Sequence, residues 1–464
     1  MDGAESFTDR FAAWMATGAD YAWGWPTMGM LALVGIWLTI RLRGLQFRRL
    51  GMALGMVVGK GDATVGDEGD ISNFQALMTA LSATVGTGNI AGVAIAVATG
   101  GPGALFWMWV MGLVGMATKF AEAVLAVHYR IRDERGTMGG GPMYYLARGL
   151  KWRFAAGAFA VFTVIASLFG LGNIVQANSI AHGLEATFSA PPWATGLVLA
   201  AGTAAVMLGG IKSIGRVAGV VVPVMICAYV GCATVILAMH VGKIPDALLL
   251  VVEEAFTDTA ATGGFAGAAM AMGIRQGISR GLFSNESGLG SAPIAAAAAK
   301  TRHPVQQALY SMTQTFIDTI VICSMTGLVL LVTGEWSSGL TGSELTAKAF
   351  DTGIPGGRYV VTIGLLFFAW TTMLGWSYYG EKALEFLVGS RAVKAYRAVF
   401  VVLVAVGAVM EVDAVWDIGD ISNALMALPN LLGILALTPV IVNLTNNYFM
   451  DGGNDWESFK GDGS

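Results

Sequence analysis

Long apolar runs recur along this chain, and short polar stretches separate them. A helix needs about 20 residues to cross the hydrocarbon core of a bilayer, and eleven runs approach or exceed that length. They lie at residues 27–42, 74–98, 103–127, 154–181, 195–210, 217–240, 262–297, 306–333, 359–379, 393–410 and 422–445. The pattern predicts an all-α polytopic membrane protein with about 11 transmembrane helices.

Glycine and small polar residues interrupt two of these runs in mid-span. The first break covers residues 82–92, and the second covers residues 283–293. Unwinding a helix frees N–H and C=O groups that lipid cannot satisfy, so a break is expected to persist only where it lines a cavity. Two discontinuous helices at matching places in a chain indicate a transporter binding site near the bilayer midplane.

The spans also have an internal order. After the first span, the remaining ten divide into five and five, and the first span of each set carries a break. Because five is odd, the second set must have the opposite membrane orientation, as an inverted-topology repeat requires. We expect a first repeat in residues 74–260 and a second in residues 261–445, followed by a cytoplasmic tail in residues 446–464.

Residues 1–73 stand outside this repeat. They contain the first span, which we interpret as an accessory transmembrane helix. An amphipathic stretch at residues 45–58 follows it, with two arginines suited to the lipid surface on the cytoplasmic side. A soluble loop is the alternative interpretation of this stretch.

Composition supports the membrane interpretation and orients the chain. Of its 464 residues, 55% are hydrophobic and 12% are charged, whereas a soluble domain has about 25% charged residues. With the N-terminus outside, twenty of the 27 Lys and Arg residues fall in cytoplasmic stretches and four fall outside. The positive-inside bias predicts that the N-terminus lies outside and the C-terminus in the cytoplasm. We expect a multi-pass protein of the plasma (inner) membrane.

The motifs argue against an enzyme. Residues 277–281 match the nucleophile pattern G-x-S-x-G, but they lack the strand–turn–helix setting that gives the pattern meaning. The three cysteines and four histidines have no metal-ligand spacing, and no P-loop is present. We therefore expect no enzymatic activity, no cofactor and no nucleic-acid partner. The expected partners are the lipid bilayer and a small substrate.

The first break suits a carboxylate on one side and a cation on the other. Gly86 and Gly88 give it the flexibility to turn successive N–H groups inward. The half-helix after the break directs its positive dipole end toward the site, which favours a carboxylate. The half-helix that ends near Val85 presents free carbonyl oxygens, which favour a cation. A tightly packed glycine-rich helix without a ligand is the alternative.

In the second break, Glu286 is the only acid of its predicted span. An intramembrane carboxylate is expected to have a partner or a function. The partner could be Arg275 or Arg280 in the preceding half-helix, or Glu286 could face the ammonium of a zwitterionic substrate. Phe283 would supply an apolar wall, and Ser284 with the freed carbonyls near it could accept hydrogen bonds from an ammonium.

Two adjacent threonines provide a candidate ion site. The hydroxyls of Thr371 and Thr372 follow the carbonyl of Phe368 by one helical turn, which can place three oxygens on one side of a helix. Together with the carbonyls of Ser82 and Val85 they would form a five-oxygen sodium site without a formal charge. The alternative is that both hydroxyls bond only to their own helix backbone.

Three further polar residues lie deep in predicted spans. Gln176 carries an amide that needs a partner in hydrocarbon, either a neighbouring helix or a ligand. Lys119 and Glu122 are separated by three positions on one helix, and we expect them to pair with each other in a structural role.

With these residues in view, the chain resembles the alanine or glycine:cation symporter family, the sodium:alanine symporters. The resemblance covers roughly residues 25–445. The segments that carry it are residues 74–80, 86–92, 139–145, 283–293, 375–382 and 423–430.

The resemblance implies the amino acid–polyamine–cation superfamily and the five-plus-five inverted-repeat fold of the neurotransmitter:sodium symporters. That fold has discontinuous first and sixth core helices, with one extra N-terminal helix here. The implied activity is uptake of L-alanine, D-alanine or glycine, driven by a sodium gradient. No cofactor is implied, and Na⁺ is the coupling ion.

The resemblance also implies roles for individual residues. Thr87 and Gly88 are similar to the substrate carboxylate site of the family, and Trp376 resembles the wall that limits side-chain size. Ala83 stands where the family can carry a bulkier apolar residue. The residues similar to the region around the substrate ammonium are Gln176, Phe283 and Glu286.

Some questions stay open at this point. A channel, a substrate-sensing receptor and a proton-coupled transporter are the alternative functions. The sequence also does not decide the preference between alanine and glycine, the tolerance of the D-enantiomer, the transport stoichiometry, the oligomeric state or the conformational state.

Overall fold

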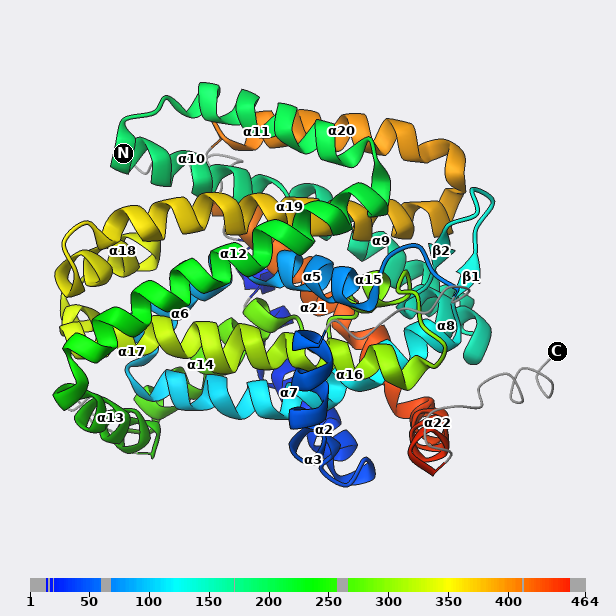
Figure 1. Cartoon of the computed structure of the whole chain (residues 1–464), viewed down its shortest axis with the longest axis horizontal. Helices are drawn as coiled ribbons and strands as arrows, with labels where there is room; N and C mark the ends of the chain where they lie inside the picture. Colours follow the sequence, from blue (N-terminus) through cyan, green and yellow to red (C-terminus); the bar gives the residue numbers. More distant parts are fainter. Residues whose placement is uncertain are drawn as a thin grey trace, which may run out of the picture.

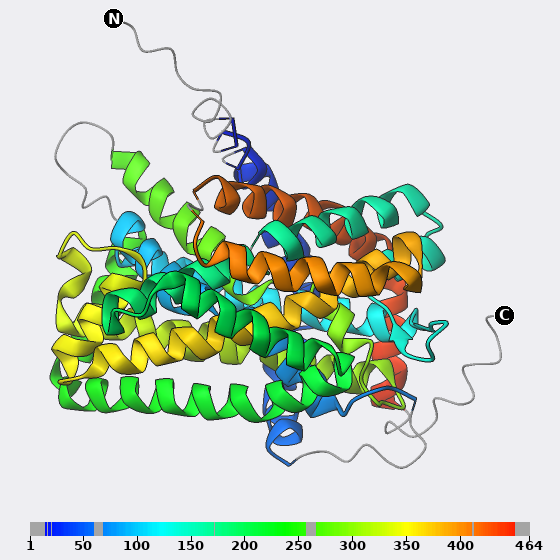
Figure 2. The ribbon, with the colours of Figure 1, turned by 90° about the horizontal axis from the view of Figure 1, so that it is seen from above.

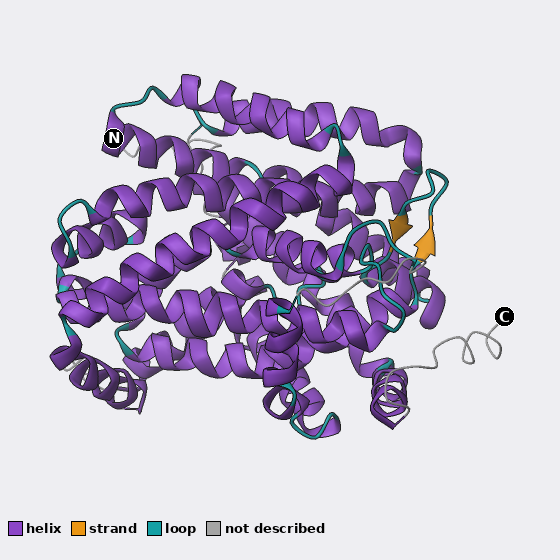
Figure 3. Cartoon of the chain, in the orientation of Figure 1, coloured by secondary structure: helices purple, strands orange, loops and turns teal. Residues whose placement is uncertain are grey.

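The structure is a computed structural model that describes residues 14–15, 17–19, 21–59, 68–170, 172–256, 266–410 and 413–450. Within these residues it is helical apart from one short hairpin of β1 (Ile131–Arg132) and β2 (Met138–Gly139) (Figure 3). The prediction of a helical protein is confirmed. Residues 451–464 of the predicted tail lie outside the described residues, as do residues 1–13, 16, 20 and 60–67 of the N-terminal segment.

The first half of the chain begins with the predicted accessory helix and amphipathic stretch, both of which are helical. Their elements are α2 (Trp25–Arg41), α3 (Leu45–Arg48) and α4 (Leu50–Val58). The predicted first repeat contains α5 (Asn73–Thr84), the π-helix η1 (Gly88–Gly92), α6 (Val93–Gly100), α7 (Gly103–His128), α8 (Pro142–Gly149), α9 (Arg153–Phe169), α10 (Ile174–Phe188), α11 (Pro192–Met207), α12 (Gly210–Met239), the 3₁₀ turn η2 (Val241–Lys243) and α13 (Ile244–Phe256).

The second half repeats the pattern of a broken helix followed by longer ones. Its elements are α14 (Ala266–Asn285), α15 (Pro293–Ala296), α16 (Pro304–Thr315), the π-helix η3 (Phe316–Cys323), α17 (Ser324–Thr333), the 3₁₀ turn η4 (Glu335–Ser337), α18 (Gly342–Gly353), α19 (Gly357–Val388), the 3₁₀ turn η5 (Ser390–Ala392), α20 (Val393–Gly407), α21 (Asp413–Ala436) and α22 (Thr438–Met450).

The first predicted break is present between α5 and η1. A capping box starts α5: the hydroxyl of Ser72 accepts from the Gln75 N–H, and the Gln75 side chain accepts from the Ser72 N–H, both at 3.1 Å. The helix ends at Thr84, and helical structure resumes at Gly88. The two parts are bent by 52°. The break is therefore narrower than the predicted range of residues 82–92.

The second predicted break lies between α14 and α15. Three of its residues have positive φ angles: 55° at Glu286, 92° at Gly288 and 83° at Gly290. This left-handed region suits glycine but is uncommon for a residue with a side chain. The backbone here cannot continue the helix, and Pro293 starts the next helical turn.

The two broken helices run in opposite directions. The short half α15 packs against α5, and the long half α14 packs against η1 and α6. A backbone bridge also pairs Ile71, just before α5, with Ala299, just after α15. The start of the first broken helix thus lies beside the end of the second. An inverted repeat requires this arrangement.

The long helix α19 runs through the middle of the bundle and brings its residues beside both halves of the chain (Figure 1). Helices α11 and α20 lie together on one side of it, and α7 and α14 lie on the other. Turned by 90°, the bundle shows α12 along one border and α20 and α21 toward the opposite one (Figure 2). The residues of both breaks, 85–87 and 286–292, are buried in this bundle.

Among the described residues, six helices are long and apolar enough to cross a membrane, or seven if the bent pair of α5 with η1 and α6 is one span. The outer helices expose large apolar side chains, for example Val198, which is 72% exposed, and Val220, which is 64% exposed. Such surfaces suit lipid rather than water. The count of eleven spans stays a prediction.

Two predicted spans are less regular than the sequence indicates. The span at residues 154–181 is not one helix, because α9 ends at Phe169 and α10 begins at Ile174. A Cβ atom at Gly172 would lie 2.7 Å from Cβ of Trp376, so the absence of a side chain here permits a close approach to α19. The predicted span at residues 422–445 crosses the junction between α21 and α22.

Candidate substrate and ion site

The five oxygen-bearing residues predicted for sodium lie together at the first break. The hydroxyl of Thr372 lies 3.0 Å from the carbonyl oxygens of Ser82 and Phe368, and 3.4 Å from that of Val85. The hydroxyl of Thr371 lies 3.0 Å from the Phe368 carbonyl oxygen. A hydroxyl carries one proton and can donate one hydrogen bond at a time, so acceptor oxygens are in surplus around Thr372. Hard cations prefer such a group of oxygens.

Glycine at position 86 makes this convergence possible. A Cβ atom there would lie 2.6 Å from the Thr372 hydroxyl oxygen, which is too close for an ordinary contact. The backbone of the first break therefore reaches α19 only because Gly86 lacks a side chain.

Gln176 lies beside the same break. Its amide nitrogen donates to the hydroxyl of Thr87 at 3.2 Å. Its amide oxygen is buried and has no hydrogen-bond partner within the described part of the chain. A buried acceptor that lacks a partner is costly, which makes this oxygen suited to a ligand that donates hydrogen bonds. The sequence left two possible partners for the Gln176 amide, a neighbouring helix or a ligand. The structure shows a hydrogen bond to a residue of the first break, Thr87.

The first break also touches the second. A Cβ atom at Gly88 would lie 3.1 Å from Cα of Ser284 and 3.3 Å from the ring of Phe283. The predicted carboxylate site at Thr87 and Gly88 therefore packs against the end of α14. All four residues are buried.

The side chain of Glu286 is turned toward α19. Its carboxylate accepts from the indole N–H of Trp376 at 3.0 Å and from the hydroxyl of Ser291 at 2.5 Å. Arg280, one of the partners considered from sequence, instead lies with its guanidinium carbon 5.7 Å from the centre of the Phe283 ring. Glu286 and Trp376 thus form a contact between the second break and the predicted wall of the pocket.

Asp318 is a buried residue that the sequence reasoning missed. One of its carboxylate oxygens accepts from the amide of Asn89 at 2.7 Å, and the other accepts from the hydroxyl of Ser284 at 2.9 Å. The carboxylate therefore joins the first break to the end of α14. The available signal was its position, because Asp318 is the only acid in the predicted span at residues 306–333.

Lys119 and Glu122 attract each other electrostatically, as expected, but their hydrogen bonds go to other partners. The ammonium of Lys119 donates to the backbone carbonyl of Glu286 at 3.0 Å. The carboxylate of Glu122 accepts from the N–H groups of Gly288 and Gly290, each at 3.1 Å. Both side chains are buried and lie on the face of α7 that contacts the second break, where the unwound backbone offers them hydrogen-bond partners.

A separate charged cluster joins the β1–β2 hairpin to the end of α19. The ammonium of Lys382 donates to Asp133 at 2.5 Å and to Glu385 at 3.0 Å. Arg135 of the hairpin also pairs with Glu385, at 2.8 Å. Burial raises the pKa of Asp133, but the hydrogen bonds from Lys382 and Thr137 outweigh burial and leave that pKa below its usual value.

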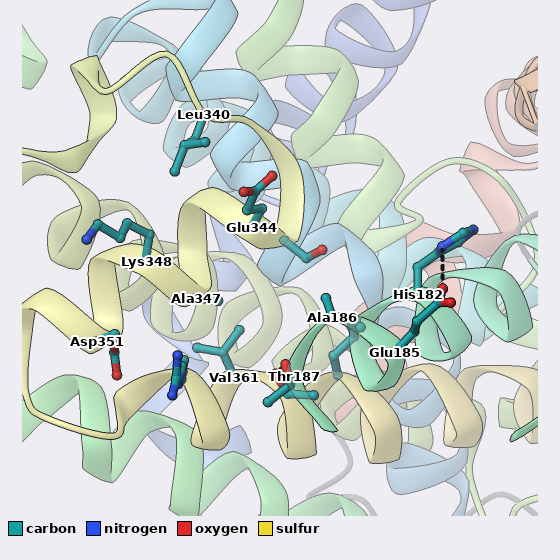
Figure 4. Close-up of a pocket in the computed structure, with 15 residues that line it drawn as sticks. His182, Glu185, Ala186, Thr187, Leu340, Glu344, Ala347, Lys348, Asp351 and Val361 are labelled. Atoms are coloured by element: carbon teal, nitrogen blue, oxygen red, sulfur yellow. Dashed lines mark hydrogen bonds and ion pairs between the residues drawn. The ribbon is translucent and has the colours of Figure 1, made fainter. Parts of the chain in front are cut away.

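A surface cavity of about 670 Å³ opens between α10, α18 and α19 (Figure 4). Its wall carries charged side chains of both signs, among them Glu344 and Lys348 on α18, and His182 pairs with Glu185 across one turn of α10. None of the predicted site residues lines this cavity. The cavity is therefore distinct from the group of residues at the two breaks.

Comparison with known proteins places these features in a family. Residues 8–458 match the Sodium:alanine symporter family. The chain is 50% identical over 446 residues to the sodium/alanine symporter AgcS of Methanococcus maripaludis. This match covers 94% of this chain and 97% of AgcS. It is 49% identical over 433 residues to an uncharacterized transporter of Haemophilus influenzae, covering 93% of this chain and 94% of that protein.

A solved structure also has a similar fold. The crystal structure of MhsT in complex with L-phenylalanine matches with a TM-score of 0.52 at 14% identity. The match covers 82% of this chain and 99% of the MhsT chain. At this identity the match supports a shared fold and nothing further about the substrate.

Proposed function

The chain belongs to the sodium:alanine symporter family, and we propose that it imports small neutral amino acids together with sodium by alternating access. Family membership supports the coarser statement directly: the chain is a multi-pass membrane protein that couples sodium to amino-acid transport. The finer proposal names alanine and glycine as substrates, with D-alanine as a substrate to be tested.

The surplus of oxygens around Thr372 carries this proposal. We assign the sodium ion to the carbonyl oxygens of Ser82, Val85 and Phe368 with the hydroxyls of Thr371 and Thr372. Three of these oxygens lie 3.0–3.4 Å from the Thr372 hydroxyl, so they are close enough together to share one hard cation. The set joins α5 to α19, so sodium would hold the first break against α19.

The amino acid would lie beside this ion. Its carboxylate would bind the N–H groups that begin η1, next to Thr87 and Gly88, where the helix dipole favours a negative charge. Its ammonium would face the free amide oxygen of Gln176 and the side of the second break formed by Ser284 and Glu286. The backbone would thus recognise the zwitterion that all amino acids share.

Size discrimination would come from apolar walls. Trp376 is 1% exposed, and Phe283 lies against the first break. A fixed indole rejects larger side chains because they would overlap with it. In an apolar pocket, one extra methylene is worth about 1–3 kcal/mol of discrimination. Ala83 packs closely against Gly375 of α19: a Cβ atom at Gly375 would lie 2.7 Å from Cβ of Ala83. No side chain fits between these two residues.

The proposal includes the membrane topology expected from sequence. It has eleven spans, N-out and C-in, with the accessory segment at residues 1–73, repeats at 74–260 and 261–445, and a tail at 446–464. The opposite directions of the two broken helices and the MhsT-like fold support the five-plus-five repeat.

The test is uptake of radiolabelled alanine into proteoliposomes with imposed sodium or pH gradients and unlabelled competitors. We expect concentrative uptake that collapses with a sodium ionophore. Thr372→Ala should raise the sodium concentration for half-maximal uptake by about tenfold, because it removes one oxygen ligand worth about 1–2 kcal/mol. Thr362→Ala is the matched control on α19, because the Thr362 hydroxyl pairs with Thr187 beside the surface cavity.

Several results would contradict the proposal. Uptake driven by a pH gradient alone would replace sodium with protons. Equilibration without accumulation would indicate a channel, and binding without flux would indicate a receptor. An unchanged sodium requirement in Thr372→Ala would remove the assigned ion site while leaving the family function intact.

A further inference from the structure

The second break is a segment of unwound backbone in which side chains bond several of the backbone N–H and C=O groups. The N–H of Ser287 donates to the side chain of Asn285 at 2.9 Å, and the N–H groups of Gly288 and Gly290 donate to Glu122. The carbonyl of Glu286 accepts from the ammonium of Lys119. In hydrocarbon each of these groups would otherwise be left unpaired at high cost.

A second element, α21, also holds the same segment. The amide of Asn430, on α21, donates to the carboxylate of Glu122 at 2.7 Å and to the carbonyl of Gly288 at 2.8 Å. The hydroxyl of Tyr145, on α8, donates to the amide oxygen of Asn430. Glu122 and Asn430 are fully buried. The chain of contacts therefore runs from α7 through the break to α21 and α8.

This network ends at the wall of the pocket. Lys119 fixes the backbone of Glu286, which has a left-handed φ of 55°. The carboxylate of Glu286 in turn accepts the indole N–H of Trp376 at 3.0 Å. A change in the backbone at Glu286 would move its carboxylate and release the indole from its present position.

We propose that Lys119 and Glu122 are positioning residues for substrate selectivity: by fixing residues 286–290 they fix Glu286 and, through it, the indole of Trp376. Neither side chain needs to touch the substrate. The proposal rests on the assignment of Trp376 as the wall of the amino-acid pocket.

Two properties of the pair suit this role. Hydrogen bonds that involve a charged group are shorter and stronger than neutral ones, so they hold a segment without helical bonds more firmly. The two charged groups also need different partners: the ammonium only donates hydrogen bonds and binds a carbonyl, whereas the carboxylate only accepts them and binds N–H groups. The pair therefore specifies the positions of the Glu286 carbonyl and of the Gly288 and Gly290 N–H groups.

The experiment compares Lys119→Met, Glu122→Ala and Glu122→Gln in the full-length protein in proteoliposomes. The measured quantity is the ratio of Vmax/KM for alanine to that for valine. We expect Lys119→Met and Glu122→Ala to lower this ratio by about tenfold, the range of discrimination that one or two methylenes give in an apolar pocket. Glu122→Gln retains an acceptor oxygen and should retain most of the ratio.

A buried lysine elsewhere provides the matched control. Lys382 is 1% exposed, like Lys119, but it belongs to the cluster at the β1–β2 hairpin. Lys382→Met should lower stability without changing the ratio for alanine and valine. The sodium concentration for half-maximal uptake should stay within about twofold in Lys119→Met, because the ion site lies at the other break.

A second measurement does not depend on transport. Amide hydrogen exchange at residues 286–290, without substrate, should speed up in Lys119→Met and Glu122→Ala but not in Lys382→Met. Tyr145→Phe removes one outer hydrogen bond of the network, and it serves if the α7 variants do not fold. It should speed up exchange at the same residues and lower the ratio by a smaller factor.

The outcomes separate this inference from the proposed function. Faster exchange with an unchanged ratio would overturn the link to selectivity, as would a ratio that falls equally in Lys382→Met. Unchanged exchange in every α7 variant would overturn the positioning role itself. If the unmodified protein fails to transport alanine with sodium, the proposed function fails, while the exchange measurement still decides whether α7 fixes the second break.

Discussion

Replacing Gly86 with alanine tests whether the first break and α19 meet as closely as the ion site requires. The new methyl group would lie 2.6 Å from the hydroxyl oxygen of Thr372 and 3.6 Å from the amide oxygen of Gln176. Non-bonded heavy atoms are most favourable at about 3.5–4.0 Å, so the hydroxyl or the break must move by roughly 1 Å.

The expected magnitude follows from what this movement breaks. The Thr372 hydroxyl would leave the carbonyl oxygens of Ser82 and Val85, now at 3.0 and 3.4 Å. A hydrogen bond is worth about 1 kcal/mol, and overpacking a buried site costs about 1–3 kcal/mol. We expect the sodium concentration for half-maximal alanine uptake to rise by about 10- to 100-fold, which corresponds to about 1.4–2.8 kcal/mol.

The assay is alanine uptake into proteoliposomes over a range of sodium concentrations. Gly157→Ala, in α9, is the control, because a Cβ atom there meets nothing within 4 Å. It should leave the sodium requirement unchanged. A double variant, Gly86→Ala with Thr372→Ala, removes the oxygen that the methyl group would strike.

The double variant contains the refuting result. If the clash is with the Thr372 hydroxyl, Gly86→Ala should add little to the effect of Thr372→Ala alone, so the two effects should be strongly non-additive. Full additivity would mean that the methyl group acts elsewhere. An unchanged sodium requirement in Gly86→Ala would mean that the first break does not lie against Thr372 during sodium binding.

Two further predictions concern the pocket wall and the hairpin cluster. Trp376→Ala should let unlabelled valine and leucine compete with alanine uptake about tenfold better, and unchanged competition would show that the wall has been misassigned. For the hairpin cluster, the lowered pKa of Asp133 is the basis, because an acid with a lowered pKa stabilises the folded state above its unfolded pKa of about 3.9. The apparent Tm of the purified protein should therefore fall as the pH drops through about 4 and below. Asp133→Asn should lower the Tm at pH 7 and flatten this acid dependence, and equal acid sensitivity in both proteins would assign the effect to other groups.

The sequence by itself determined the class of protein and the places where its helices break. Hydropathy follows from local composition, so apolar runs were visible without knowledge of their neighbours. The break at Gly86 and Gly88 and that at Gly288 and Gly290 were visible for the same reason, because glycine and small polar residues are unusual inside a run of membrane length. The set of oxygens near Thr372 was also predicted, from two adjacent hydroxyls and the carbonyls freed at the first break.

Only the tertiary structure decided which distant groups meet. The spacing of Lys119 and Glu122 predicted a local pair. Both side chains also bind the unwound backbone of the second break, 160 or more positions later in the chain. Asp318 accepts hydrogen bonds from residues near both breaks, which are far apart in sequence. Gly172, just before Ile174, lies close to Trp376 of α19. Helix positions follow from local pattern, whereas partners follow from packing, because hydrogen-bond demand in a bilayer is met by whichever side chain the fold brings within about 3 Å.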